Sequence, residues 1–293
     1  MYRRLRTRPL LNKIKKQDFN PDDIRNALSE CSKNCPFSTF PYSIKGNITS
    51  KEALKKYGCG NCITLSMYIK NLLRKRLGLK SFLIPATIPK AYQKPGYLEI
   101  SHVALAIPKS QEEIWIADPA FYFTHPISFD KENYPKTSTN VNIWADTIDN
   151  FDYVRGALQD KFVPNKWQRL PKKTNFLECS YHHDPMDKWK YFLREIMNPD
   201  EAISTFFIRI RREPWITMLD DQYRCKFQIK RLPGDNIMIK KYGEVLYSGP
   251  VSTIPTNIEI PEKFIGKLIT GKIKNYRCKK KKNQSTRKLS KKR

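Results

Sequence analysis

The sequence predicts an α+β fold in which helices come first, a central antiparallel sheet or barrel follows, and the C-terminal part is rich in strands. Early apolar residues recur at helical spacing, whereas later apolar runs alternate with a period of two. Of the 293 residues, 40% are hydrophobic and 12% are aromatic, which is enough to bury a sizeable core. We therefore expect a globular protein.

Basic residues are concentrated at the two ends of the chain. The formal net charge is +27; residues 272–293 hold twelve Lys and Arg, residues 1–16 hold seven, and neither stretch contains an acid. Like charges repel and stay solvated, so we expect a basic N-terminal arm over 1–18 and a disordered basic tail over 272–293. The tail is compatible with a nuclear address, with a nucleic-acid tether, or with a solvated segment that binds nothing.

Neither a membrane segment nor a secreted disulfide scaffold is expected. The sequence has no stretch of about eighteen apolar residues, and the charged N-terminus leads into no apolar run. Seven cysteines make an odd number, without the spacing of a small disulfide framework. We expect an intracellular protein, cytoplasmic or nuclear, that does not bind a membrane.

Two short helices are predicted before the first glycine-rich loop. Asn20-Pro21-Asp22-Asp23 combines an N-cap with proline at the first helical position and begins a helix that reaches about Leu28. Thr49-Ser50-Lys51-Glu52 begins another, which runs through Leu54. Between them, residues 36–41 read as a turn-rich aromatic connection.

The loop Tyr57-Gly58-Cys59-Gly60-Asn61-Cys62 runs into the most regular helical pattern of the chain. Apolar residues at helical spacing predict a helix from Ile63 to Leu77, and Gly78 stands where a C-terminal glycine cap belongs. This helix would carry Cys62 at its first turn.

Two alternating runs predict a β-hairpin that follows that helix in the chain. Residues 81–88 form a β-rich run, Leu98 to Ala106 alternate around His102, and Ile114, Ile116 and Asp118 alternate on the next strand. If the hairpin is centred near Ser110, His102 lies directly opposite Asp118 on one face. Opposed Cβ atoms are about 4.5–5.5 Å apart, which allows an imidazole–carboxylate hydrogen bond.

The remaining chain predicts a long irregular region, a helix and a second β-rich part. The region after Phe121, up to about Lys173, contains Trp144 and Trp167 and reads as irregular, and Lys188 to Met197 reads as a helix. The expected domains are a catalytic core over 19–180 and a helix with a β-rich part over 181–271. The expected strands are Phe206 to Ile210, Tyr223 to Lys230, Ile237 to Lys240 and Val245 to Tyr247.

Cys62, His102 and Asp118 are the candidate catalytic residues. A thiol reacts as its thiolate, which a helix N-terminus and a nearby imidazolium favour. His102 would take the thiol proton, and Asp118 would hold its tautomer. Backbone N–H groups of Gly60, Asn61 and Ile63 would form an oxyanion hole. Taken alone, a buried cysteine or a strand histidine is more often a core residue, so the combination of residues makes the prediction.

Other arrangements of the same residue types remain open. Cys31, Cys35, Cys59 and Cys62 have spacings that a tetrahedral zinc ion accepts. Cys59 and Cys62 also form a C-x-x-C pair, although no thioredoxin-like context surrounds it. A third cluster consists of Cys179, His182 and His183. A surface loop is the simpler interpretation of this cluster.

The order Cys, His, Asp resembles the transglutaminase-like cysteine superfamily and, within it, the arylamine N-acetyltransferases. The intervals between these residues are 40 and 16 positions. The family's Arg-Gly-Gly motif is Gly58-Cys59-Gly60 here, and its Glu two positions past the Cys is Thr64. The motifs that carry the resemblance are Gly60-Asn61-Cys62, Leu72-Leu73-Arg74, Leu77-Gly78, Trp115-Ile116-Ala117-Asp118-Pro119, Ala120-Phe121 and Ser204-Thr205-Phe206.

The resemblance implies an acyltransferase in which Cys62 carries the acyl group and an amine accepts it. Acetyl-CoA or another acyl-CoA would be the co-substrate, and no metal is implied. No glycine-rich phosphate loop marks a coenzyme A site. One alternative is a transglutaminase-like protease or amidase that acts on a protein, and another is a non-enzymatic module of the same fold that binds nucleic acid through its basic ends.

Overall fold

The computed structural model describes the helical N-terminal part, most of the strands and the C-terminal sheet. Residues 1–14 of the expected arm, the whole expected tail, the run Phe206 to Ile210 and the pair His182 and His183 lie outside the described residues. The described ranges are 15–45, 48–87, 100–110, 113–121, 125–130, 141–146, 153–158, 163–169, 175–180, 188–193, 195–196, 214–221, 225–258 and 260.

Four helices form the N-terminal part. They are α1 (Pro21–Asn34), α2 (Phe40–Lys45), α3 (Ser50–Tyr57) and α4 (Cys62–Leu77). Asn20 and Thr49 are capping-box residues of α1 and α3, as the sequence predicts. α1 continues past the expected end because Cys31 extends its buried stripe by one more turn. The expected turn over 36–41 instead holds β1 (Phe37–Ser38) and the start of α2.

A seven-stranded antiparallel sheet follows, with strand order β5-β4-β3-β2-β10-β9-β8. The expected irregular region after Phe121 is wrong in part, because β5 to β8 lie in it. The expected helix from Lys188 is also wrong over β10, whose backbone pairs with both β9 and β2. The strands are β2 (Phe82–Thr87), β3 (Ile100–Pro108), β4 (Glu113–Ala117), β5 (Ile127–Asp130), β8 (Val163–Arg169), β9 (Asn175–Ser180) and β10 (Lys188–Phe192).

A second antiparallel sheet and a separate hairpin complete the described structure. The second sheet has the order β1-β11-β12-β13-β14 and comprises, besides β1, the strands β11 (Trp215–Leu219), β12 (Cys225–Arg231), β13 (Asn236–Lys241) and β14 (Glu244–Pro250). The hairpin consists of β6 (Val141–Asp146) and β7 (Tyr153–Leu158). Since β1 pairs with β11, the N-terminal part is joined to the C-terminal sheet by backbone hydrogen bonds.

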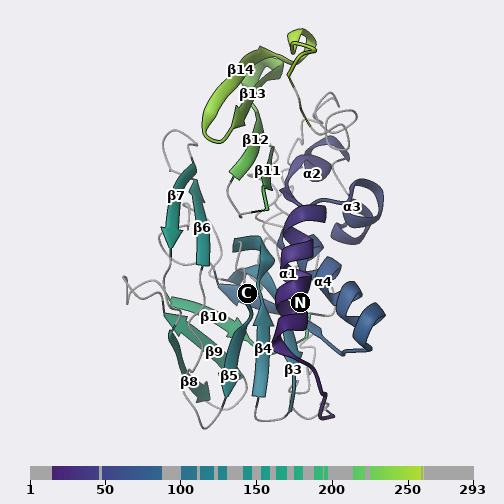
Figure 1. Cartoon of the computed structure of the whole chain (residues 1–293), viewed down its shortest axis with the longest axis vertical. Helices are drawn as coiled ribbons and strands as arrows, with labels where there is room; N and C mark the ends of the chain where they lie inside the picture. The colour runs from purple at the N-terminus through teal and green to yellow at the C-terminus, as the bar shows by residue number, and fades with distance from the viewer. Residues whose placement is uncertain are drawn as a thin grey trace, which may run out of the picture.

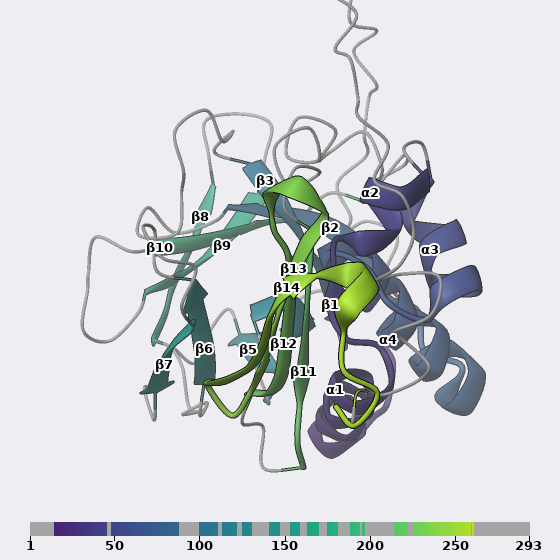
Figure 2. The same cartoon turned by 90° about the horizontal axis from the view of Figure 1, so that it is seen from above.

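The helices pack on one side of the strands. In Figure 1, α1 and α4 lie beside β3 and β4, with the five-stranded sheet above them, and Figure 2 shows β6 and β7 on the far side from the helices. Val103, Leu105 and Ile107 of β3 belong to the core that α1 and α4 cover. Ala104 and Ala106 on the opposite face are buried as well. Both faces of β3 therefore lie inside the protein.

The β3–β4 hairpin forms with a register two residues away from the expected one. Leu105 pairs with Ala117, so Asp118 follows the strand at the position opposite Ala104, and not opposite His102. A slip of two residues preserves the face on which each side chain lies. His102 and Asp118 are therefore diagonal neighbours on the same face, within reach of each other's side chains.

Among the residues that the structure describes, no helix is long and apolar enough to span a membrane.

Candidate active site

Cys62 is the first residue of α4, and two caps determine where that helix begins. Gly58 ends α3 with a φ of 63°, a left-handed conformation that suits glycine. Asn61 is the N-cap of α4, and its side-chain oxygen accepts the N–H of Thr64 at 3.1 Å. The thiol is consequently held at a helix N-terminus, where the helix dipole favours a negative charge. Cys62 is only 5% exposed.

Gly60 is needed at its position because of a close approach rather than an unusual φ. Its carbonyl accepts the N–H of Ser38 at 2.7 Å, which ties the loop to β1. A Cβ atom on Gly60 would lie 2.3 Å from Thr64 Oγ1 and 2.8 Å from Tyr42 Oη. Any side chain there would displace the turn that leads into Cys62.

His102 and Asp118 are joined in the buried interior. The imidazole Nε2 of His102 lies 2.9 Å from Asp118 Oδ1 and 2.8 Å from Oδ2. The two residues are 3% and 0% exposed. With the carboxylate at Nε2, the ring nitrogen left to face other partners is Nδ1. The two side chains that the sequence places on one face are thus hydrogen-bonded to each other.

The thiol of Cys62 reaches the same imidazole. Burial opposes a charge on His102 most strongly, but the Asp118 carboxylate outweighs it through its charge and hydrogen bond. A hydrogen bond with Cys62 acts in the same direction, and together these partners raise the pKa of His102 to about 10. The site therefore favours an imidazolium at neutral pH, between a thiol and a carboxylate.

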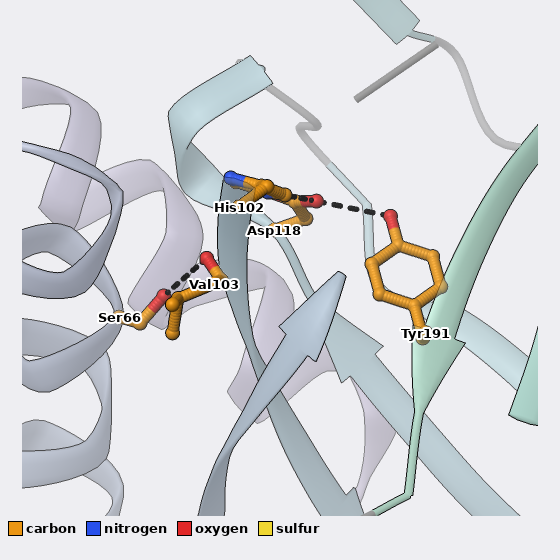
Figure 3. A network of polar contacts seen from close by, with 5 residues as sticks. All are labelled: Ser66, His102, Val103, Asp118 and Tyr191. Atoms are coloured by element: carbon orange, nitrogen blue, oxygen red, sulfur yellow. Dashed lines mark hydrogen bonds and ion pairs between the residues drawn. The ribbon is translucent and has the colours of Figure 1, made fainter. Parts of the chain in front are cut away.

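Tyr191 is a member of this group that sequence reasoning missed. Its hydroxyl donates to Asp118 Oδ2 at 3.0 Å, and the residue is fully buried (Figure 3). Ala86 pairs with His102 on one side and with Tyr191 on the other, so the three share one face. The small Ala86 leaves room for the ring to extend toward Asp118. The signal was hidden because the segment around Tyr191 reads as a helix.

A further contact joins the helix of Cys62 to the strand of His102. Ser66 lies one turn after Cys62, and its hydroxyl donates to the carbonyl oxygen of Val103 at 3.3 Å (Figure 3). Val103 is the residue after His102, so the tie connects the two elements beside the site.

The zinc arrangement and the C-x-x-C pair do not form, and the cluster of Cys179, His182 and His183 lies partly outside the described residues. Among the residues described here, no three His, Cys, Asp or Glu side chains come together as a metal-binding group, so Cys31, Cys35, Cys59 and Cys62 do not build the zinc site. Cys59 packs in the core of the C-terminal sheet with Phe40 and Ile216, whereas Cys62 belongs to the helical core. Cys62 is a free thiol.

Solved structures of arylamine N-acetyltransferases are similar to this chain in fold. The protein from Salmonella typhimurium is 14% identical, with a TM-score of 0.49 over 84% of this chain and 82% of that chain. The protein from Nocardia farcinica is 11% identical, with a TM-score of 0.48 over 89% of this chain and 91% of that chain. A Bacillus cereus protein described as having a Cys-His-Glu catalytic triad is 14% identical, with a TM-score of 0.47 over 82% of this chain and 89% of that chain. No protein-family model and no curated protein matches the sequence.

Proposed function

We propose that the chain is a thiol-dependent acyltransferase in which Cys62 is the nucleophile, His102 the general acid and base, and Asp118 the orienting carboxylate. The buried hydrogen bond between Asp118 and His102, together with the Cys62 thiol that raises the pKa of the same imidazole, carries this proposal. A metal-free acyl transfer needs a nucleophile, a proton carrier and an orienting group in this order. The three residues supply them from a helix start and two adjacent strands.

The first half-reaction would acylate the thiol. The Cys62 thiolate attacks the carbonyl carbon of an acyl donor, and the carbonyl oxygen takes up the electron pair as a C–S bond forms. The N–H groups of Gly60 and Asn61 donate to the carbonyl oxygen of Pro36 and to Tyr42 Oη. The proposed oxyanion donors are therefore the N–H groups of Cys62 and Ile63, which lie in the first turn of the helix. When the intermediate collapses, His102 gives its proton to the leaving group, and an acyl-Cys62 remains.

The second half-reaction would return the site to its starting state. An amine attacks the acyl-Cys62 carbonyl, and neutral His102 takes the proton that the nitrogen loses. Collapse then breaks the C–S bond and releases the amide together with the Cys62 thiolate. Asp118 remains ionised throughout and stabilises the imidazolium each time it forms.

The proposed donor is an acyl-CoA and the proposed acceptor is an arylamine or a similar small amine. The resemblance of Gly60-Asn61-Cys62 and of the residues around Asp118 to the arylamine N-acetyltransferases supports this choice. Both substrates react through the same acyl-Cys62, so the first half-reaction can be tested without knowing the acceptor.

The test is to incubate the protein with acetyl-CoA and locate any added acetyl group by peptide mass spectrometry. We expect one acetyl group on the peptide that contains Cys62, and its loss when an arylamine is added. An unmodified Cys62 would contradict the proposed donor. Release of the acetyl group to water at the same rate with and without amines would instead identify a hydrolase.

A further inference from the structure

Four polar side chains lie buried directly behind the nucleophile. Tyr42 comes from α2, Ser50 from the start of α3, and Asn61 and Thr64 from the start of α4. Tyr42 is 2% exposed and the other three are fully buried. We call these four residues the Tyr42 network.

The hydrogen bonds of the Tyr42 network form a closed ring. The Tyr42 hydroxyl donates to Ser50 Oγ at 3.2 Å, and the Ser50 hydroxyl donates to Asn61 Oδ1 at 3.1 Å. The hydroxyl oxygens of Thr64 and Tyr42 are 2.8 Å apart, so one of the two hydroxyls donates to the other, and Thr64 Oγ1 also lies 3.2 Å from the carbonyl oxygen of Ser50. The ring closes where Asn61 Oδ1 accepts the N–H of Thr64.

The ring holds the backbone on both sides of Cys62. The N–H of Asn61 donates to Tyr42 Oη at 3.3 Å, and the N–H of Thr64 is held by Asn61. Between these two fixed amides, the position of Cys62 has little freedom. The same hydroxyls also abut Gly60, where a Cβ would collide with Thr64 and Tyr42.

The Tyr42 network contains no charge. Burial is the main reason that the pKa of Tyr42 lies far above its usual range. Its hydrogen bonds with Ser50 and Thr64 lower that pKa, and the nearby Cys62 raises it further. The hydroxyl of Tyr42 is therefore close enough to respond to the charge of the thiol, yet stays neutral itself. Thr64 stands where the arylamine N-acetyltransferase pattern has Glu, and Gly58 where it has Arg, so this chain holds the loop with neutral groups.

We propose that Tyr42 is a positioning residue that, through Asn61 and Thr64, holds Cys62 at the point where its thiol meets His102. The inference rests on the proposed role of Cys62. The Tyr42 network sets the place of the thiol and adds no titration of its own, so its loss lowers the reactivity of Cys62 by the same factor at every pH.

The experiment measures alkylation of Cys62 by iodoacetamide between pH 6 and 9, followed by peptide mass spectrometry so that the other thiols do not interfere. Tyr42→Phe removes the central hydroxyl, and Thr64→Val removes one hydroxyl at nearly constant volume. Thr64→Ser keeps that hydroxyl and is the conservative rescue. Tyr68→Phe is the matched control, because the Tyr68 hydroxyl donates to Glu30 at 3.3 Å, on the side of α4 that meets α1.

We expect Tyr42→Phe and Thr64→Val to slow the alkylation by about tenfold, because a small misplacement of a reacting group has a large effect on its rate. Thr64→Ser should restore most of the rate, and Tyr68→Phe should match the wild type. Melting temperatures of all variants separate loss of fold from loss of position.

Alkylation at the wild-type rate in both Tyr42→Phe and Thr64→Val would overturn the proposal. So would an equal loss in Thr64→Val and Thr64→Ser. If Tyr42→Phe fails to fold, the Thr64 pair decides alone. The proposed function is judged separately with His102→Gln. Equal alkylation rates in His102→Gln and the wild type would contradict the proposed role of His102. The ratio of the Tyr42→Phe rate to the wild-type rate, which tests Tyr42, would not change.

Discussion

The two sides of the candidate site are built by different means. The nucleophile side consists of Cys62 and the Tyr42 network, whose residues lie within one short stretch of chain and carry no charge. The base side consists of His102, Asp118 and Tyr191, which come from β3, the end of β4 and β10 and include a buried carboxylate. The first is held by caps and hydroxyls, and the second by the register of a sheet.

This difference assigns separate tasks to the two sides. A neutral network contributes position and no pH dependence, whereas the pH response of the base side should come from His102, whose pKa its partners raise to about 10. Changes on the nucleophile side should therefore alter rates uniformly across pH. Changes on the base side should alter the rate together with the ionisation of His102.

The largest effect is expected for the nucleophile itself. Cys62→Ser should abolish acyl transfer, because a serine hydroxyl at this site would not be ionised as a thiol can be. Cys59→Ser is the control, since Cys59 packs in the other core and does not meet His102. Transfer activity with acetyl-CoA and an arylamine is the measurement. Comparable losses of activity in Cys62→Ser and Cys59→Ser would contradict the assignment of Cys62 as the nucleophile.

Asp118→Asn should have the next largest effect. The variant should retain its fold but lose about three to four orders of magnitude in kcat, as expected when the orienting carboxylate of a triad is replaced by an amide. Without the carboxylate, burial should hold the pKa of His102 below its ordinary value instead of above it. NMR of the imidazole nitrogens across pH would report this. An unchanged titration would contradict the role of Asp118.

Gly60→Ala tests the close packing on the nucleophile side. The added methyl group would meet Thr64 Oγ1 and Tyr42 Oη, so the turn must shift. We expect a loss of about 1–3 kcal/mol in unfolding free energy, typical of overpacking, and a fall in rate of about a hundredfold from misplacement of the thiol. Denaturant unfolding and alkylation of Cys62 measure the two effects. The pH profile should keep its shape.

Tyr191→Phe should have a smaller effect on the base side. Asp118 would lose one hydrogen bond but keep both contacts with His102. We expect a fall in kcat of about tenfold or less, similar to the loss of other groups that support a functional residue from behind. The titration of His102 should also shift slightly. A pH profile and rate equal to those of the wild type would leave Tyr191 with a packing role only.

The smallest effect is expected in the pH dependence of stability. The folded pKa of His102 lies above its ordinary value of 6.5, so its stabilising contribution is fully present below pH 6.5 and is lost as the pH rises through about 10. The wild type should exceed Asp118→Asn by about 1–3 kcal/mol at the lower pH, which is typical of a charged hydrogen bond. Denaturant unfolding from pH 6 to 10 should show that the difference in unfolding free energy between the wild type and Asp118→Asn becomes smaller as the pH rises. A difference that widens would reverse the predicted sign.

The position of Cys62 and the shared face of His102 and Asp118 could be predicted well because their signals are local. The N-cap Asn61 and the glycine after Leu77 define α4 within one residue of its expected bounds. Alternation placed His102 and Asp118 on one face, and a slip of two residues in the hairpin did not change that face. Side-chain periodicity survives such an error because it has a period of two.

Tyr191 and the Tyr42 network could not be predicted in the same way. The segment around Tyr191 has a helical pattern, and it becomes a strand because β2 and β9 both offer it backbone hydrogen bonds. Tyr42 follows directly after the stretch over 36–41 that reads as a turn, and only packing brings its hydroxyl to Asn61 and Thr64. Long-range pairing outweighs local propensity in both segments.

By itself, the sequence determined the start of α4, the face that His102 and Asp118 share, and the α+β class, because caps and periodicity act over a few residues. The tertiary structure decided which thiol meets the histidine, which tyrosine supports the carboxylate, and that Cys59 and Cys62 pack in different cores. These depend on which strands become neighbours and on how two cores divide the chain. Such choices are made by burial and pairing across the whole fold, and no short stretch of residues encodes them.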